Sequence, residues 1–307
     1  MNDRPGNVGA SVRTRLLSVA RERREDFQEI LIRYALERLL YRLSVSEYRN
    51  IFILKGAMLF SVWMDKSHRP TRDVDFLSMG EVSVERYEAI VRTLCELRVE
   101  DDGLIFHPDT VRGESMKEAA EYQGVRLELR ATLDTARIPV RIDVGFGDVI
   151  TPALVEIAYP TLLGFPPPLL RAYPVETVIA EKFQALVALG LANSRMKDFY
   201  DLWLLARSFE FNGQGLCDAI QATFRRRRTQ VPGDAPVALT ALFAGDAAKS
   251  SQWNAFIRRS GLDDRSVTLG DTLTKLVEFL LPPAGAAAHG RRFDAIWKPD
   301  VGWTPVL

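Results

Sequence analysis

Cysteine is scarce in this chain, and its scarcity excludes two common kinds of site. Only Cys95 and Cys217 occur among the 307 residues, far apart and outside any CxxC spacing. Structural zinc sites and dithiol redox motifs need closely spaced ligands or thiols. The sequence therefore predicts neither kind of site, and it fits the reducing conditions of the cytoplasm.

The chain also lacks an excess of either charge and any long apolar run. Forty basic residues balance forty acidic ones, so no whole-surface attraction to nucleic acid or anionic membrane is expected, although local basic patches can still form. No run reaches the ~18 apolar residues of a membrane span. Pro282 and Pro283 break the most apolar stretch, residues 277–288. Because the first ten residues carry no apolar signal core, we expect a cytoplasmic protein that does not contact membranes.

The chain has the length of about two domains at ~150 residues each. Apolar residues at the i, i+3, i+4, i+7 spacing predict a helix over residues 11–45. Strict alternation predicts half-buried strands in "VRLELRA" (125–131) and "IPVRIDVGF" (138–146). Shorter apolar runs predict strands at 51–54 and 74–77 and helices at 58–63 and 83–98.

Prolines between residues 152 and 168 punctuate the chain and mark a domain boundary. We therefore predict an α/β (α+β) domain of mixed β-sheet with flanking helices over residues 1–165, including the N-terminal helix. A mainly helical domain is expected over residues 166–307, with helices at 175–190, 196–208, 214–226, 250–259 and 268–281. The run Arg225–Arg228 falls at a helix C-terminus, where the macrodipole favours cations; contact with a polyanion is the alternative.

The segment "HRPTRDVDFLSMG", residues 68–80, carries two acids on an otherwise apolar strand. Asp73 and Asp75 share one face because side chains alternate across a strand. Like charges this close raise each other's pKa unless a cation lies between them, and Mg²⁺ or Mn²⁺ commonly fills that place. The DxD pair alone also fits two solvated acids in a turn.

Two further features favour a metal–nucleotide site. Asp143 also lies on a predicted strand, on its polar face, and three carboxylates on neighbouring strands can bind two metal ions. Gly56 lies in a strand-to-helix turn, where backbone N–H groups can approach a phosphate and a helix N-terminus favours an anion. A lone glycine at this position also fits an ordinary turn.

Three charged residues fall on apolar helices of the C-terminal half. Lys182 lies inside the broad apolar face of the helix at 175–190, where lysine is rarely buried unless it is paired. It is either a cation held for a triphosphate or carboxylate, or a lysine whose ammonium reaches the rim. Asp198 and Asp201, at i and i+3, share a face of an apolar helix and need partners there. They serve either the chemistry or a purely structural pairing with Arg195, Lys197 or Lys182.

Five segments, in the expected order, together resemble the AbiEii/AbiGii toxin family of nucleotidyltransferases, within the DNA polymerase β-like superfamily. The resemblance spans about residues 10–285, and the motifs are specific only in combination. The segments are "FILKGAMLF", "HRPTRDVDF", "RIDVGFGD", "AEKFQAL" and "SRMKDFYDL".

The resemblance implies a role for each matching position. Gly56 and Ala57, with Lys55 before them, match the phosphate-loop motif, although the superfamily usually has Gly-Ser there and this chain lacks the hydroxyl. Backbone N–H groups can replace that contact. Asp73 and Asp75 match the metal-binding pair, Asp143 the third carboxylate, Lys182 the helical lysine, and Asp198 and Asp201 the final acids. Arg69 and Arg72 are expected to offset the acids' charge or contact phosphates, and Thr71 to shape the turn into the strand.

The resemblance further implies an enzyme that uses Mg²⁺ (or Mn²⁺) to transfer NMP from an NTP to an acceptor. It would act as the toxin of a bacterial toxin–antitoxin or phage-defence pair, with a cognate antitoxin protein as partner. RNA, as the 3′ end of tRNA, is the implied acceptor, while nucleotide and protein acceptors stay open. The C-terminal domain is expected to complete the active-site cleft.

Three other functions use similar acids. A haloacid-dehalogenase phosphatase is disfavoured because its motif has Thr or Val two residues after the second acid, where this chain has Leu77. A DxD glycosyltransferase stays open, although nothing else points to a sugar site. A catalytically degenerate module that binds nucleotide or antitoxin also stays open, but four acids and bases of the motifs are retained together: Asp73, Asp75, Asp143 and Lys182.

Overall fold

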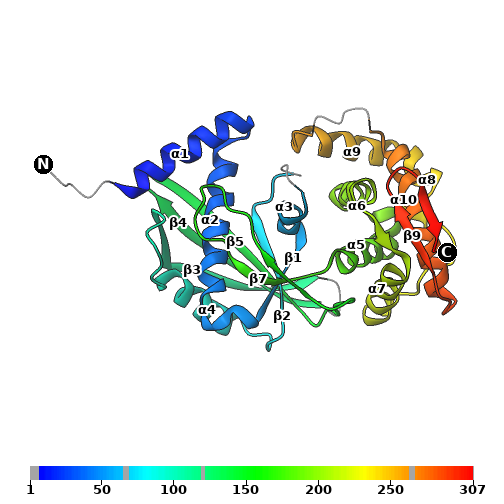
Figure 1. Cartoon of the computed structure of the whole chain (residues 1–307), viewed down its shortest axis with the longest axis horizontal. Helices are drawn as coiled ribbons and strands as arrows, with labels where there is room; N and C mark the ends of the chain where they lie inside the picture. The colour runs from blue at the N-terminus through cyan, green and yellow to red at the C-terminus, as the bar shows by residue number, and fades with distance from the viewer. Residues whose placement is uncertain (1–6, 65–68, 119–121, 263–266, 307) are drawn as a thin grey trace, which may run out of the picture. The chain divides into compact units, whose positions relative to one another are not determined.

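The computed structural model of the chain describes residues 7–64, 69–118, 122–262 and 267–306 (Figure 1). The chain divides into two compact units. The first comprises residues 1–147 and 155–172, and the second comprises residues 148–154 and 173–307. The backbone therefore passes between the units three times, after residues 147, 154 and 172.

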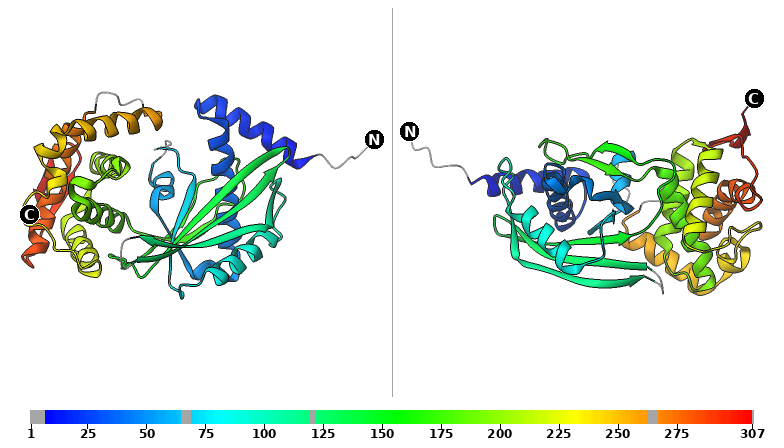
Figure 2. Two further views of the ribbon diagram at one scale, coloured as in Figure 1. Left: turned by 180° about the vertical axis from the view of Figure 1, so that it is seen from behind. Right: turned by 90° about the horizontal axis from the view of Figure 1, so that it is seen from below.

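The first unit is built on a mixed sheet of seven strands in the order β3-β4-β5-β2-β1-β7-β6. Strand β2 runs parallel to β5, and β1 runs parallel to β7, while the other neighbouring pairs are antiparallel. The long strands β3, β4 and β5 run side by side in Figure 2. The predicted mixed sheet is thus confirmed. The strands are β1 Phe52–Lys55, β2 Asp73–Ser78, β3 Leu104–Glu118, β4 Tyr122–Leu133, β5 Ala136–Phe146, β6 Val155–Ala158 and β7 Leu169–Ala172.

The central strands have one apolar face and one polar face, as their alternation predicts. On β5, for example, Val140, Ile142 and Val144 are buried. Helices α2 (Phe27–Ser44) and α4 (Val84–Glu96) pack against the sheet, α2 on β5 and α4 on β3 and β4. The apolar face and these helices form the core of the first unit, which leaves the polar face for charged side chains.

The single helix predicted over residues 11–45 is wrong. The structure has two helices there, α1 (Val8–Arg23) and α2. Arg24 adopts a left-handed conformation (φ 57°) that ends α1, and the side chain of Asp26 accepts a hydrogen bond from the Glu29 N–H and begins α2. The first N–H groups of a helix have no partner within the helix. The Asp26 side chain accepts a hydrogen bond from one of them and so stabilises the start of α2.

The second unit is mainly helical, as predicted, and it adds a small three-stranded sheet that the sequence did not predict. None of the helices in the described part of the chain combines the length and apolar character that crossing a membrane requires. The helices are α5 Val175–Leu189, α6 Met196–Ser208, α7 Gly213–Arg226, α8 Ala241–Gly245, α9 Ala247–Arg259 and α10 Leu269–Ala288, and the strands are β8 Phe211–Asn212, β9 Ala295–Lys298 and β10 Gly302–Pro305.

Helix α10 continues through the two prolines that were expected to break it, and ends at Ala288 instead of 281. A proline inside a helix has no N–H for the carbonyl four residues before it. For Pro283 that carbonyl belongs to Phe279, and it accepts a hydrogen bond from the Trp303 indole N–H at 3.0 Å. Strand β10 thus supplies the donor that the proline lacks.

The arginine run Arg225–Arg228, at the C-terminal end of α7, includes a residue with a structural role. Arg227 lies 3.1 Å from Asp148 and 3.4 Å from Glu181, and it donates to the Gln184 side chain at 3.0 Å. Its side chain is only 18% exposed. Arg227 therefore fixes residues 148–154 to α5, a role that neither expectation for the run included, while Arg225 and Arg226 occupy the last turn of α7.

The first unit buries a network of charges between α2 and the chain around Asp102. Asp102 accepts hydrogen bonds from Arg38 at 3.1 Å and from Arg42 at 2.7 Å. Beside them Glu37 accepts from the Leu162 N–H at 2.7 Å, and its other oxygen is 3.8 Å from Arg38. Burial outweighs these contacts and raises the pKa of Glu37 from its ordinary 4.5 to about 7.

We expect Glu37→Gln to change how stability depends on pH. Because the folded protein holds the Glu37 proton more tightly than the unfolded chain, the contribution of Glu37 to stability is largest below pH 4.5 and is lost as pH rises to about 7. The amide of the variant cannot ionise, yet its carbonyl can still accept from the Leu162 N–H. Between pH 5 and pH 8 the variant should gain on the order of 2 kcal/mol relative to wild type.

Urea unfolding at pH 5 and pH 8 measures this difference. The control is Glu210→Gln, which makes the same substitution at an exposed position outside the buried network and so separates the effect of burial from that of the substitution itself. Parallel pH profiles for wild type and Glu37→Gln would contradict the assignment.

Candidate functional site

Three carboxylates lie on the polar face of the first unit's sheet. Asp73 and Asp75 are half-buried on β2, on either side of the buried Val74. In the parallel pairing of β2 with β5, Asp75 is the direct neighbour of Asp143. Since in-register neighbours on adjacent strands point to the same side of a sheet, all three acids share this face. The register therefore places together the carboxylates that the sequence analysis selected.

Gly56 lies against one of these acids. Its φ of +75° belongs to the left-handed region that favours glycine. A Cβ on Gly56 would overlap the Asp75 carboxylate and lie 2.7 Å from its Cγ. A side chain at position 56 would have to displace Asp75, so the turn and the acid form one structural feature.

The turn at Gly56 opens a 3-10 turn, Gly56–Leu59, followed by the short helix α3, Phe60–Trp63. The helix macrodipole expected here is correspondingly small, because it grows from aligned peptide units. In the structure the space that the glycine leaves is taken by the Asp75 carboxylate, and phosphate binding at Gly56 and Ala57 stays a prediction.

Lys55 ends β1 and is the direct antiparallel neighbour of Asp75. Its side chain reaches across the sheet to Gly145 on β5, where a Cβ would lie 3.4 Å from the Lys55 ammonium. Gly145 thus leaves room for this ammonium two residues beyond Asp143. A cation is therefore present at the edge of the carboxylate group, on the side of the Gly56 turn.

Asp143 is held from the other side by an arginine that the sequence analysis did not select. Arg126 on β4 donates from Nε and Nη2 to the two carboxylate oxygens of Asp143, both at 2.8 Å. These hydrogen bonds raise the pKa of the Arg126 guanidinium, which stays charged. The available signal was the alternation in "VRLELRA", which puts Arg126 on the polar face of its strand.

The donor set suits a hard divalent cation, because carboxylate oxygens are the ligands that Mg²⁺ and Mn²⁺ prefer. In this conformation, however, both oxygens of Asp143 face Arg126. Among the described residues, no group of three His, Cys, Asp or Glu side chains is arranged to hold a metal ion. For all three acids to bind a metal ion, Asp143 would have to give up at least one of its hydrogen bonds to Arg126.

The residues before β2 take different positions. Thr71 donates to the Asp73 carboxylate at 2.9 Å and so fixes its orientation. Arg72 is largely exposed and pairs with Glu29 of α2 at 3.4 Å. Arg69 also interacts with another group of the protein. Phosphate binding by the two arginines stays a prediction.

The second unit brings Lys182, Asp198 and Asp201 together. The Lys182 ammonium on α5 lies 2.8 Å from each carboxylate on α6, and both acids are fully buried. Arg195 adds a second cation, 2.6 Å from Asp198. Of the partners considered for these acids, the structure shows Lys182, which contacts both, and Arg195, which contacts Asp198.

Burial raises the pKa of Asp198, but the charges of Lys182 and Arg195 and the hydrogen bond from Lys182 outweigh it and lower the pKa overall. Two acids and two cations thus lie together with balanced charge. Lys182 keeps 12% of its side chain exposed.

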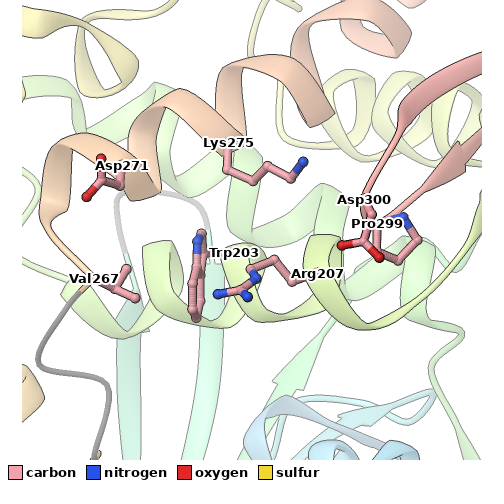
Figure 3. A pocket seen from close by; sticks show the side chains of 7 residues that line it. All are labelled: Trp203, Arg207, Val267, Asp271, Lys275, Pro299 and Asp300. Atoms are coloured by element: carbon pink, nitrogen blue, oxygen red, sulfur yellow. The ribbon is translucent and has the colours of Figure 1, made fainter.

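The second unit also contains a pocket of about 350 Å³ (Figure 3). Trp203, at its wall, has two close neighbours: the Arg207 guanidinium lies 4.7 Å from the ring, and the Tyr200 ring 5.5 Å. Two cations and two acids face the pocket, so its charge is balanced. Its lining is Trp203, Arg207, Val267, Asp271, Lys275, Pro299 and Asp300, and it includes no residue of the candidate site.

Two solved structures, both from Helicobacter pylori, are similar to this chain at 14% sequence identity. JHP933 has a TM-score of 0.48 over 86% of this chain and 94% of its own. A candidate nucleotidyltransferase has a TM-score of 0.45 over 86% of this chain and 96% of its own. The comparison with curated proteins found no match.

A family comparison covers most of the chain. The sequence model for the nucleotidyl transferase AbiEii toxin, of type IV toxin–antitoxin systems, matches residues 38–297. That range contains Gly56, the three carboxylates and the Lys182 group, and it includes parts of both structural units. The chain therefore belongs to the AbiEii family of nucleotidyl transferase toxins.

Proposed function

We propose that this enzyme transfers NMP from an NTP to an acceptor, with release of pyrophosphate, and that a divalent ion, Mg²⁺ or Mn²⁺, is held by Asp73, Asp75 and Asp143. The observation that carries the proposal is the register of β2 and β5, which makes Asp75 the neighbour of Asp143 on the face that also carries Asp73. Such an ion supplies charge stabilisation to the phosphoryl group in transfer.

The chain's own groups have defined tasks in this proposal. Backbone N–H groups at Gly56 and Ala57 bind phosphate oxygens, and Lys55 adds positive charge beside them. Thr71 keeps the Asp73 carboxylate oriented through its 2.9 Å hydrogen bond. Arg69 and Arg72 contact the outer phosphates, for which Arg72 would leave its partner Glu29.

Lys182 is proposed to contribute to turnover by contacting the triphosphate. Its two acids hold the ammonium charged and in place, and its partial exposure permits a substrate contact. The alternative is a purely structural lysine, because a buried ion-pair group also fixes how α5 and α6 pack.

RNA, in particular the 3′ end of tRNA, is the proposed acceptor, and a cognate antitoxin is the proposed protein partner. The support is family membership. Transfer of α-³²P label from each of the four NTPs to total RNA and to total protein tests the acceptor. Label in RNA supports the proposal, label in protein alone contradicts it, and no transfer with any NTP favours a degenerate binding module.

Asp75→Ala should reduce label transfer at least roughly 1,000-fold, because it removes the proposed metal ligand that lies between Gly56 and Asp143. Stability should change little, since Asp75 is only half-buried and its removal ends both its attraction to Lys55 and its repulsion from Asp143. Wild-type enzyme should lose transfer in EDTA and regain it with Mg²⁺. Full activity of the variant, or activity that resists EDTA, would exclude this site.

Gly56→Ala should reduce transfer at least roughly 100-fold, because the new Cβ displaces the Asp75 carboxylate. The matched control is Gly164→Ala. Gly164 has nearly the same φ, +73°, but a Cβ there meets nothing within 4 Å. Both variants should be destabilised by ~1–2 kcal/mol through the left-handed backbone.

Thermal unfolding and label transfer on the same preparations separate strain from displacement. If Gly56→Ala and Gly164→Ala have the same activity, the contact between Gly56 and Asp75 is irrelevant to the reaction.

Lys182→Met should be nearly inactive and destabilised by ~1–3 kcal/mol, because its ammonium no longer accompanies two buried carboxylates. Arg195 still offsets Asp198. Adding Asp201→Asn to Lys182→Met should therefore restore stability better than adding Asp198→Asn, and neither double variant should regain activity. A structural lysine predicts instead that activity recovers together with melting temperature.

A further inference from the structure

The starting observation is a row of charges across the polar face of the sheet. Neighbouring strands place Lys55, Asp75, Asp143, Arg126 and Glu114 side by side, in that order. Two adjacent acids thus have a cation on each side. Within the row, the two central acids are matched by these two cations before any divalent ion is present.

The two cations are held differently. Lys55 reaches across the sheet from the phosphate loop to the space above Gly145. Arg126 engages both oxygens of Asp143 with two 2.8 Å hydrogen bonds, and the fork shape of its guanidinium fits a carboxylate in this way. Arg126 therefore occupies the oxygens of Asp143 that a divalent ion would need.

The same guanidinium fits phosphate equally well, since phosphate also accepts two parallel hydrogen bonds from arginine. Arg126 is 32% exposed on the polar face, and Asp143 is 15% exposed. Because the Arg126 side chain is not part of the core, it can turn from Asp143 toward a ligand on this face. A triphosphate provides the negative charge to receive it.

We propose that Arg126 makes divalent-ion binding at Asp75 and Asp143 depend on the nucleotide: it holds Asp143 in the free protein and moves to the triphosphate when an NTP binds. The inference rests on the proposed function. Because linkage is reciprocal, the ion and the NTP then strengthen each other's binding. An ion alone competes with Arg126, and an NTP alone competes with Asp143 for the same guanidinium.

The test is Arg126→Gln, which should have opposite effects on the two ligands. Without nucleotide, Mn²⁺ binding measured by electron paramagnetic resonance should tighten at least roughly tenfold relative to wild type. In EDTA, binding of the best of ATP, CTP, GTP and UTP, measured by calorimetry, should weaken at least roughly tenfold. A merely structural arginine would weaken both or neither.

Two further variants calibrate the result. Arg130→Gln removes the same charge from the same face of β4, four residues along, or about 13 Å, and should leave both affinities within about twofold of wild type. Arg126→Lys keeps the charge but loses the fork, so its Mn²⁺ affinity should lie between wild type and Arg126→Gln. Circular dichroism confirms folding, and Arg126→Lys replaces Arg126→Gln in the comparison if the latter does not fold.

The outcomes separate this inference from the proposed function. If Mn²⁺ binds Arg126→Gln no more tightly than wild type, the inference is overturned. In that case the proposed site is still supported if wild type binds Mn²⁺ in the presence of NTP and Asp75→Asn does not. If neither wild type nor any variant binds Mn²⁺, with or without NTP, the inference and the proposed function are both contradicted.

Discussion

The candidate site depends on one constraint, the parallel register of β2 against β5. This register makes Asp75 the neighbour of Asp143, and two carboxylates at neighbouring positions repel each other unless cations lie beside them. The neighbouring strands provide those cations, Lys55 from β1 and Arg126 from β4. A slip of the β2–β5 pairing by one residue would turn one of these acids toward the apolar face, so the core packing that sets the register also fixes the chemistry.

In both units, buried charged side chains form ion pairs with one another. In the first, Asp102 holds two arginines of α2, and in the second, Lys182 and Arg195 balance Asp198 and Asp201. Each of these acids has a cation of its own unit beside it, because removing a charge from water requires a partner of opposite charge. Glu37 is the exception, since its partners do not fully offset burial and its pKa rises to about 7.

Much of the fold could be predicted from periodicity, because the alternation in β4 and β5 and the apolar stripes of α5 and α6 are local signals. Strand β3 was missed because it contains Pro108 and Asp109 and a register shift between His107 and Arg112, which obscure alternation. The acids of the site could be selected as residue types. The clamp of Arg126 on Asp143 could not, since their contact depends on which strands pair and in which register.

The three passages of the backbone between the two units constrain how the protein can be divided. Residues 148–154 belong with the helices, yet they are followed by two strands that complete the sheet of the first unit. A truncation after residue 172 would leave Asp148 without Arg227, and one after residue 147 would remove β6 and β7. Neither unit can be produced alone as a simple N- or C-terminal fragment, because a fragment that contains all of the first unit also carries residues 148–154, and one that contains all of the second also carries β6 and β7. A single proteolytic cut at any one passage leaves the other two connections in place.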